Sequence, residues 1–129
     1  MARRVLLVDD EAEIREVTQV SLELMVDWHV LTAGSGAEGV ARAAADQPDA
    51  ILLDLMMPEM DGIATLQALR ASPATSHIPV ILLSAVAHGV ESQRFVGLGA
   101  AGVIAKPFDV LTLASQIATL LGWDPARRD

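Results

Sequence analysis

The chain of 129 residues contains no cysteine, no tyrosine and no long apolar run. The lack of cysteine excludes a disulfide framework and a thiolate metal site, which is typical of cytoplasmic proteins. No continuous apolar run reaches the ~18 residues that a transmembrane helix needs. Only four apolar residues separate Arg4 from Asp9, whereas the core of a secretory signal needs at least ~7 residues. We therefore expect a cytoplasmic protein that does not enter a membrane.

Positive charge is also scarce. Nine Lys and Arg stand against 17 Asp and Glu, which gives a formal net charge of −8. This excess disfavours binding to nucleic acid phosphates, so we expect no direct DNA binding. Lys106 is the one lysine of the chain. The length fits a single domain that is large enough to bury a hydrophobic core.

Short apolar runs alternate with stretches of helical periodicity along the whole chain. The expected strands are residues 4–9, 28–33, 50–54, 79–84 and 102–105. The expected helices are residues 11–25, 35–47, 62–71, 91–98 and 110–121. Asp10 with Glu13 and Ser35 with Glu38 resemble capping boxes. The buried stripe of the last helix would comprise Leu113, Ile117, Leu120 and Leu121.

This alternation predicts an α/β fold, a (βα)5 doubly wound parallel sheet. The flavodoxin-like strand order 2-1-3-4-5 would make strands 1 and 3 neighbours at the switch point where ligands bind. The sequence has no linker, repeat or low-complexity tract. Residues 3–121 would form one domain, and residues 122–129 a short C-terminal tail with no output domain.

Polar residues end four of the five expected strands. Asp9 and Asp10 follow the first strand, and Asp54 ends the apolar run 50–53 before a loop that contains Pro58. Ser84 and Lys106 end the fourth and fifth strands. Taken singly, the acids suit turns or helix caps, Ser84 suits a turn hydroxyl and Lys106 suits a surface cation. Taken together, they suit a site at the carboxyl edge of the sheet.

Converging carboxylates repel one another unless a cation joins them. With oxygen ligands alone, the preferred cation is a hard divalent ion, and Mg²⁺ suits so few carboxylates. Phosphoryl transfer needs positioning and charge neutralisation on the phosphoryl oxygens, which Mg²⁺, Lys106 and Ser84 could divide among them. A carboxylate such as Asp54 can attack phosphorus without a general base, and the product would be an aspartyl phosphate.

These motifs together resemble the receiver domain of bacterial two-component response regulators, of the single-domain, CheY-like type. The resemblance spans residues 3–121 and rests on four motifs, namely Asp9-Asp10, Asp54 with Met57-Pro58-Glu59-Met60-Asp61-Gly62, Ser84-Ala85, and Lys106-Pro107-Phe108. It implies that Asp54 is the phosphoacceptor. The phosphoryl group would come from a phosphohistidine of a sensor histidine kinase or a histidine phosphotransfer protein.

The resemblance also implies the roles of the other site residues. Asp10, Asp54 and the Met56 carbonyl would bind Mg²⁺ directly, and Asp9 would bind it through water. Ser84 would bond to the phosphoryl group, and Lys106 would pair with it. The Lys106-Pro107 bond is typically cis in this family. Such a protein is a signalling phosphoprotein, not an enzyme in the usual sense, since it catalyses only its own phosphorylation and dephosphorylation.

One position departs from the family pattern. Receivers usually carry Tyr or Phe three residues before the lysine, and here that residue is Val103. We therefore expect the switch to appear mainly in residues 85–90 and in the helix that follows. The downstream target is an unknown protein. The fourth helix, fifth strand and last helix form the usual partner face of the family, and they would allow weak homodimers.

Three alternative functions belong to other classes of protein. A pseudo-receiver is an interaction module that is never phosphorylated, and the complete set of acids, hydroxyl and lysine argues against it. A phosphatase of the haloacid dehalogenase type would need an acid two residues after its nucleophile, where this chain has Met56. A flavin carrier of the same fold would need a phosphate-binding loop after the first strand, where the acids Asp9, Asp10 and Glu11 would repel the flavin phosphate.

Overall fold

The computed structural model describes residues 3–57, 61–85, 90–106 and 108–123, in which five strands alternate with five helices. The elements are β1 (Arg3–Val8), α1 (Ala12–Met25), β2 (Trp28–Ala33), α2 (Gly36–Asp46), β3 (Ala50–Asp54), α3 (Gly62–Ala71), β4 (Val80–Ser84), α4 (Val90–Gly97), β5 (Gly102–Ala105) and α5 (Val110–Leu121). The bounds of each element agree with the sequence-based expectation to within one residue.

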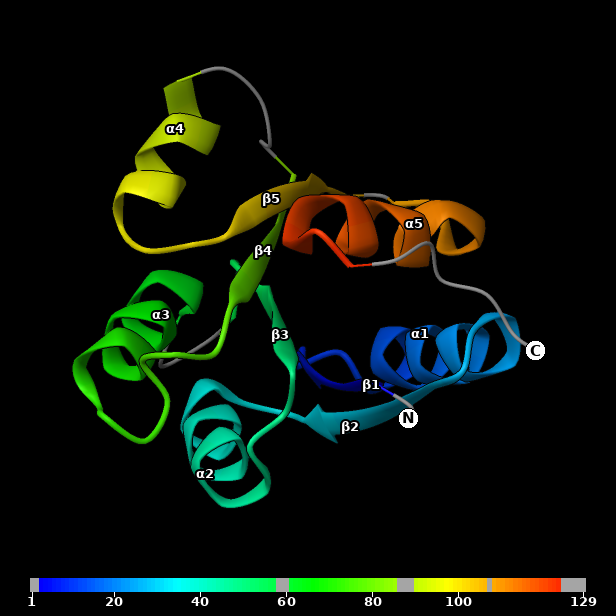
Figure 1. Cartoon of the computed structure of the whole chain (residues 1–129), viewed down its shortest axis with the longest axis horizontal. Helices are drawn as coiled ribbons and strands as arrows, with labels where there is room; N and C mark the ends of the chain where they lie inside the picture. Colours follow the sequence, from blue (N-terminus) through cyan, green and yellow to red (C-terminus); the bar gives the residue numbers. More distant parts are fainter. Residues whose placement is uncertain (1–2, 58–60, 86–89, 107, 124–129) are drawn as a thin grey trace.

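The five strands form one parallel sheet in the order β2-β1-β3-β4-β5 (Figure 1). The predicted (βα)5 doubly wound, flavodoxin-like fold is confirmed. The central strands β1 and β3 are in register with Val8 opposite Leu53. Asp9 follows Val8 at the end of β1, and Asp54 follows Leu53 as the last residue of β3. This register therefore places Asp9 beside Asp54.

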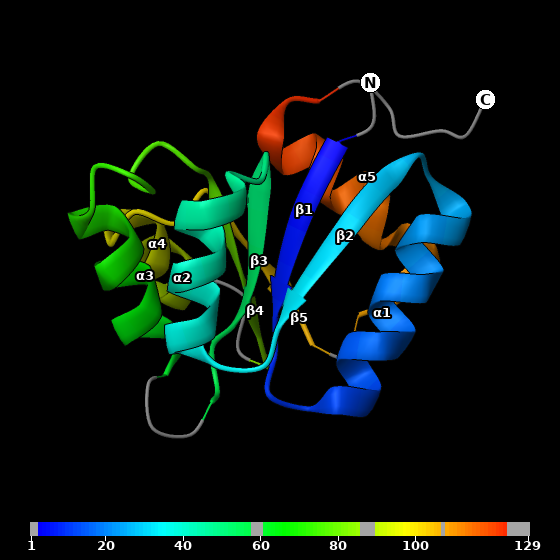
Figure 2. The same ribbon diagram turned by 90° about the horizontal axis from the view of Figure 1, so that it is seen from below.

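Helices cover both faces of the sheet, as Figures 1 and 2 show. Helices α1 and α5 lie on one face, and α2, α3 and α4 lie on the other. Side chains alternate between the two cores: Leu6 and Val8 pack on the α2–α4 side, whereas Val5 and Leu7 pack on the α1–α5 side. Strands β3 and β4 are buried at every position, which explains their continuous apolar sequences.

The capping predictions were right for one helix and wrong for the other. At α2, Ser35 Oγ accepts the Glu38 N–H at 3.1 Å, and Glu38 Oε1 accepts the Gly34 N–H at 2.7 Å. At α1, the residue before the helix is Glu11, which makes no side-chain capping bond. The Glu11 N–H instead donates to Asp9 Oδ1 at 2.9 Å, a local turn bond to the residue two positions back, so the predicted capping box of Asp10 and Glu13 does not form.

The stripe predicted for α5 is correct except at Leu120. Leu113 and Ile117 are fully buried, and Leu121 packs at the edge of the same core. Leu120 is 40% exposed and lies over Gly102 of β5, where a Cβ atom would come within 2.8 Å of Leu120 Cδ2. Leu120 thus covers the end of the edge strand. In the described part of the chain, no helix has the length and apolar character needed to cross a membrane.

Candidate functional site

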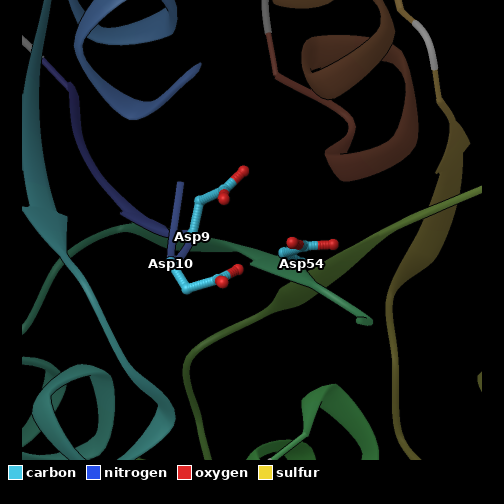
Figure 3. A group of neighbouring side chains, drawn as sticks. All are labelled: Asp9, Asp10 and Asp54. Atoms are coloured by element: carbon cyan, nitrogen blue, oxygen red, sulfur yellow. The ribbon is translucent and has the colours of Figure 1, made fainter. Parts of the chain in front are cut away.

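Three carboxylates meet at the carboxyl edge of the sheet. Asp9 and Asp10 follow β1, and Asp54 is the last residue of β3, the neighbouring strand. Figure 3 shows the three side chains gathered at the ends of these strands, and one oxygen from each lies within 4.8 Å of the others. The parallel register of β1 and β3 produces this convergence, as the sequence predicted.

Asp9 is the most deeply buried acid of the cluster. It is 0% exposed, and its Oδ1 accepts the Glu11 N–H. Its Oδ2 is buried and has no hydrogen-bond partner. Burial raises the pKa of Asp9 above its ordinary value of 3.8, and the neighbouring charge of Asp54 raises it further, whereas the Glu11 hydrogen bond and Lys106 lower it. The ionised form of Asp9 therefore lacks a full set of partners.

Asp54 is 2% exposed and held from two sides. Its Oδ1 accepts the Met56 N–H at 3.2 Å and lies 3.3 Å from Lys106 Nζ. The first contact is a turn bond to the residue two positions ahead, so Asp54 also organises its own loop. Oδ2 accepts no hydrogen bond from the described residues. Asp54 thus presents one tethered oxygen and one untethered oxygen.

Lys106 lies between two acids. Its Nζ is 3.3 Å from Asp54 Oδ1 and 3.9 Å from Asp9 Oδ2, and its side chain is only 21% exposed. The Lys106 N–H donates to the Ser84 carbonyl at 2.8 Å, which continues the pairing of β5 with β4 by one residue. This pairing places the lysine at the site edge of the sheet. The alternative that Lys106 is a surface cation is therefore wrong.

Ser84 ends β4 and is 3% exposed. It lines an open cavity of about 790 Å³ between the β3–α3 segment and α4. Met57, Ile63 and Phe95 also line this cavity. Ser84 thus lies at the edge of the acid cluster, next to a space into which neighbouring groups could move.

The residues at this edge fit a hard divalent cation. The donor set consists of carboxylate oxygens, and the buried Asp9 Oδ2 has no hydrogen bond to satisfy it. The Met56 N–H contacts Asp54, so the Met56 backbone borders the cluster. The Met56 side chain points to solvent and is 76% exposed.

Position 103, where the family usually has an aromatic residue, is occupied by valine, and Phe95 and Phe108 differ in whether they lie near it. Phe95 is 3% exposed, belongs to the same core as Val103 and lines the Ser84 cavity. Phe108 packs against the core on the opposite face of the sheet. The expectations for Pro107 and for residues 86–89 fall outside the described residues.

The chain matches the response regulator receiver domain family over residues 5–118. The response regulator PleD of Caulobacter vibrioides is 40% identical over 124 residues, which are 93% of this chain and 26% of that protein. The DNA-binding dual master transcriptional regulator RpaA of Synechocystis is 36% identical over 118 residues, 92% of this chain and 48% of that protein. The chain thus spans about half or less of these curated relatives.

Solved structures agree with this match. The chemotaxis response regulator CheY4 of Vibrio cholerae superposes with a TM-score of 0.85 at 29% identity, over 93% of this chain and 99% of that chain. The fold, the strand-end acids and the sequence match point to one family. The chain belongs to the receiver domain family of response regulators.

Proposed function

We propose that this protein is a phosphorylation-activated receiver of a two-component or phosphorelay system. Asp54 would accept a phosphoryl group from a phosphohistidine of a sensor histidine kinase or a histidine phosphotransfer protein. The observation that carries this proposal is the position of Lys106 Nζ, which lies within 4 Å of both Asp54 and Asp9 beside three clustered carboxylates. Aspartates that served only as turn or capping residues would not explain an ammonium group that points inward between them.

The transfer step uses the untethered oxygen of Asp54. Oδ1 is occupied by the Met56 N–H and by Lys106 Nζ, so Oδ2 is the oxygen available to attack. A new bond forms between Oδ2 and phosphorus while the bond from phosphorus to the donor imidazole breaks. The electron pair of that bond stays on the ring nitrogen, and no base is required at Asp54. The product is an aspartyl phosphate.

Asp10, Asp54 and the Met56 carbonyl would hold Mg²⁺, and Asp9 would contact it through water. A bound Mg²⁺ would supply positive charge to the acids and to the phosphoryl oxygens. The unsatisfied Asp9 Oδ2 and the small spread of the cluster support this assignment.

The two remaining polar strand ends would act on the transferred group. Lys106 already contacts Asp54 Oδ1 and would pair with a phosphoryl oxygen. The Ser84 hydroxyl would donate to another phosphoryl oxygen by moving toward Asp54. Such a movement changes the packing beside α4, through the cavity that Ser84 shares with Phe95. The surface formed by α4, β5 and α5 would then engage an unknown target protein or a second copy.

The testing experiment is incubation with labelled acetyl phosphate, with and without Mg²⁺. A receiver acquires a stoichiometric, acid-labile label only when Mg²⁺ is present. A pseudo-receiver acquires none, and a phosphatase, given a small phosphomonoester in a parallel assay, releases phosphate continuously. Either of the last two results would overturn the proposal. We propose no DNA contact by this chain, because its net charge is −8.

A further inference from the structure

Arg15 makes a contact with the acid cluster that the proposed chemistry does not use. It lies in the first turn of α1, and its Nη1 donates to the backbone carbonyl of Asp9 at 2.7 Å. That carbonyl belongs to the peptide unit that joins Asp9 to Asp10. The guanidinium therefore holds the backbone between two residues of the site.

The guanidinium of Arg15 occupies a slot that Gly34 leaves open. A Cβ atom at Gly34 would come within 3.1 Å of Arg15 Nη1 and 3.5 Å of its Cζ. Glu38 also lies beside Gly34, because its Oε1 accepts the Gly34 N–H at 2.7 Å. Arg15 is thus packed between the end of β1 and the β2–α2 loop, which limits the positions it can take.

Asp10 depends on its backbone for orientation. Among the described residues, its carboxylate accepts no hydrogen bond and forms no ion pair. Asp9, in contrast, is buried and bonded to the Glu11 N–H. A fixed peptide plane before Asp10 limits the direction of its Cα–Cβ bond, so the Arg15 contact helps to orient a side chain that no other described residue holds.

Arg15 contacts the site through the hydrogen bond from its Nη1 to the Asp9 carbonyl.

We propose that Arg15 is a positioning residue that holds the Asp9–Asp10 peptide in the orientation needed to bind a divalent cation. This inference rests on the proposed function, because it concerns the same Mg²⁺ site. Partners that orient metal ligands commonly change metal affinity by 10–100-fold when removed. Loss of a single hydrogen bond to a backbone carbonyl belongs at the lower end of this range.

The test is calorimetric titration of Mg²⁺ into the unphosphorylated protein, which requires no phosphoryl transfer. Arg15→Met should raise the Mg²⁺ dissociation constant about tenfold. Arg15→Lys should recover part of this loss, because it keeps an ammonium donor on a long stem. The matched control is Arg42→Met. Arg42 Nη1 also donates to a strand carbonyl, that of Thr32 at 3.0 Å, and among the described residues Arg42 contacts Asp46 but none of Asp9, Asp10 and Asp54. The Arg42 variant should bind Mg²⁺ as the wild type does.

A double variant separates positioning from a general loss of stability. Gly34→Ala presses on Arg15 and should weaken Mg²⁺ binding by less than Arg15→Met does. Combined with Arg15→Met, it should add no further loss. Equal Mg²⁺ affinity of wild type and Arg15→Met, or equal weakening by Arg42→Met, would overturn the role of Arg15 alone. Absence of Mg²⁺ binding by the wild type would overturn the proposed function itself.

Discussion

At the scale of residues, the site combines burial with crowded negative charge. Asp9 and Asp54 are both nearly inaccessible, and they share the ammonium group of Lys106. The sequence predicted which residues meet, because the ends of parallel strands lie along one edge. It did not predict which aspartate is the buried one. That depends on the turn after Val8, where the Glu11 N–H bonds to Asp9 and leaves Asp10 nearer to solvent.

The burial of Asp9 predicts a measurable pH dependence. The pKa of Asp9 is raised in the folded protein, so the folded state binds a proton more readily than the unfolded chain does. The stability that Asp9 contributes is fully present below its unfolded pKa and is lost as pH rises through the folded pKa. The Asn side chain of Asp9→Asn cannot ionise, so this variant does not lose stability as pH rises through the pKa of Asp9. At neutral pH its metal-free form should be more stable than the wild type by about 1 kcal/mol.

The measurement is urea denaturation of wild type and Asp9→Asn across the acidic to neutral range, without divalent ions. The difference in the free energy of unfolding between the two proteins should grow with pH and then level off. A difference that is constant with pH, or one that favours the wild type at neutral pH, would contradict the burial argument.

A second residue-scale prediction concerns the lifetime of the phosphoryl group. Met56 lies two residues after Asp54, and its apolar side chain offers no hydrogen bond to an attacking water. Val86, two residues after Ser84, is also apolar. We expect slower self-dephosphorylation in the wild type than in a Met56→Asn, Val86→Glu variant. The loss of label after removal of acetyl phosphate measures the self-dephosphorylation rate of each protein. Equal or faster loss from the wild type would contradict this prediction.

At the scale of elements, the loop after β3 depends on a close approach of backbone to backbone. A Cβ atom at Gly62 would meet Leu55 Cα at 2.5 Å and the Asp54 carbonyl oxygen at 2.7 Å. The Gly62 N–H also donates to the Leu55 carbonyl at 2.9 Å. The Asp-Gly pair in the sequence indicated a helix start, but the packing of α3 onto the end of β3 is visible only in three dimensions.

We predict that Gly62→Ala destabilises the fold by at least about 2 kcal/mol, because the backbone of Asp54 must shift to admit the methyl group. Gly97→Ala is the matched control, because a Cβ atom there meets nothing within 4 Å. That variant should be neutral or more stable by up to about 1 kcal/mol, owing to the higher helix propensity of alanine. Denaturant midpoints compare the two. If Gly62→Ala proves as stable as the wild type, the close-approach argument is wrong.

Helix α4 is the element in which we expect the phosphoryl signal. Val103 is short and restricted at χ1, whereas Phe95 of α4 is buried in the same core and lines the cavity beside Ser84. Beryllofluoride, a phosphoryl mimic, should therefore change amide hydrogen exchange in residues 85–100. Phe95→Leu should reduce this change, and Phe108→Leu, on the opposite face of the sheet, should leave it intact. Unchanged exchange in the wild type would exclude α4 as the responding element.

At the scale of the whole molecule, the two ends of the sheet have separate roles. Arg3 and Trp28, the first residues of β1 and β2, form a cluster with Trp123 at the edge opposite the acids. The centroids of the two tryptophan rings are 5.4 Å apart, and the rings are in an edge-to-face arrangement. Because both tryptophans of the chain lie in this cluster, their fluorescence should follow global unfolding and respond little to events at Asp54. Light scattering is the appropriate probe of any self-association through α4, β5 and α5.

Sequence periodicity was sufficient for the fold because each strand is rich in apolar residues and the segments between the strands have helical periodicity. It was insufficient where rotation of an element decides the outcome. Leu120 lies over the edge strand, and Met56 extends into solvent beside a buried aspartate. The reach of Arg15 back to the Asp9 carbonyl likewise depends on how α1 packs beside the β2–α2 loop.

The central claim is that Asp54 is the single phosphoacceptor. Intact-mass spectrometry of wild type and Asp54→Asn, after incubation with acetyl phosphate and Mg²⁺, tests it most directly. The wild type should gain the mass of one phosphoryl group, and Asp54→Asn should gain none while remaining folded by tryptophan fluorescence. Stoichiometric modification of folded Asp54→Asn would contradict the account, because the phosphoryl group would then reside on another residue.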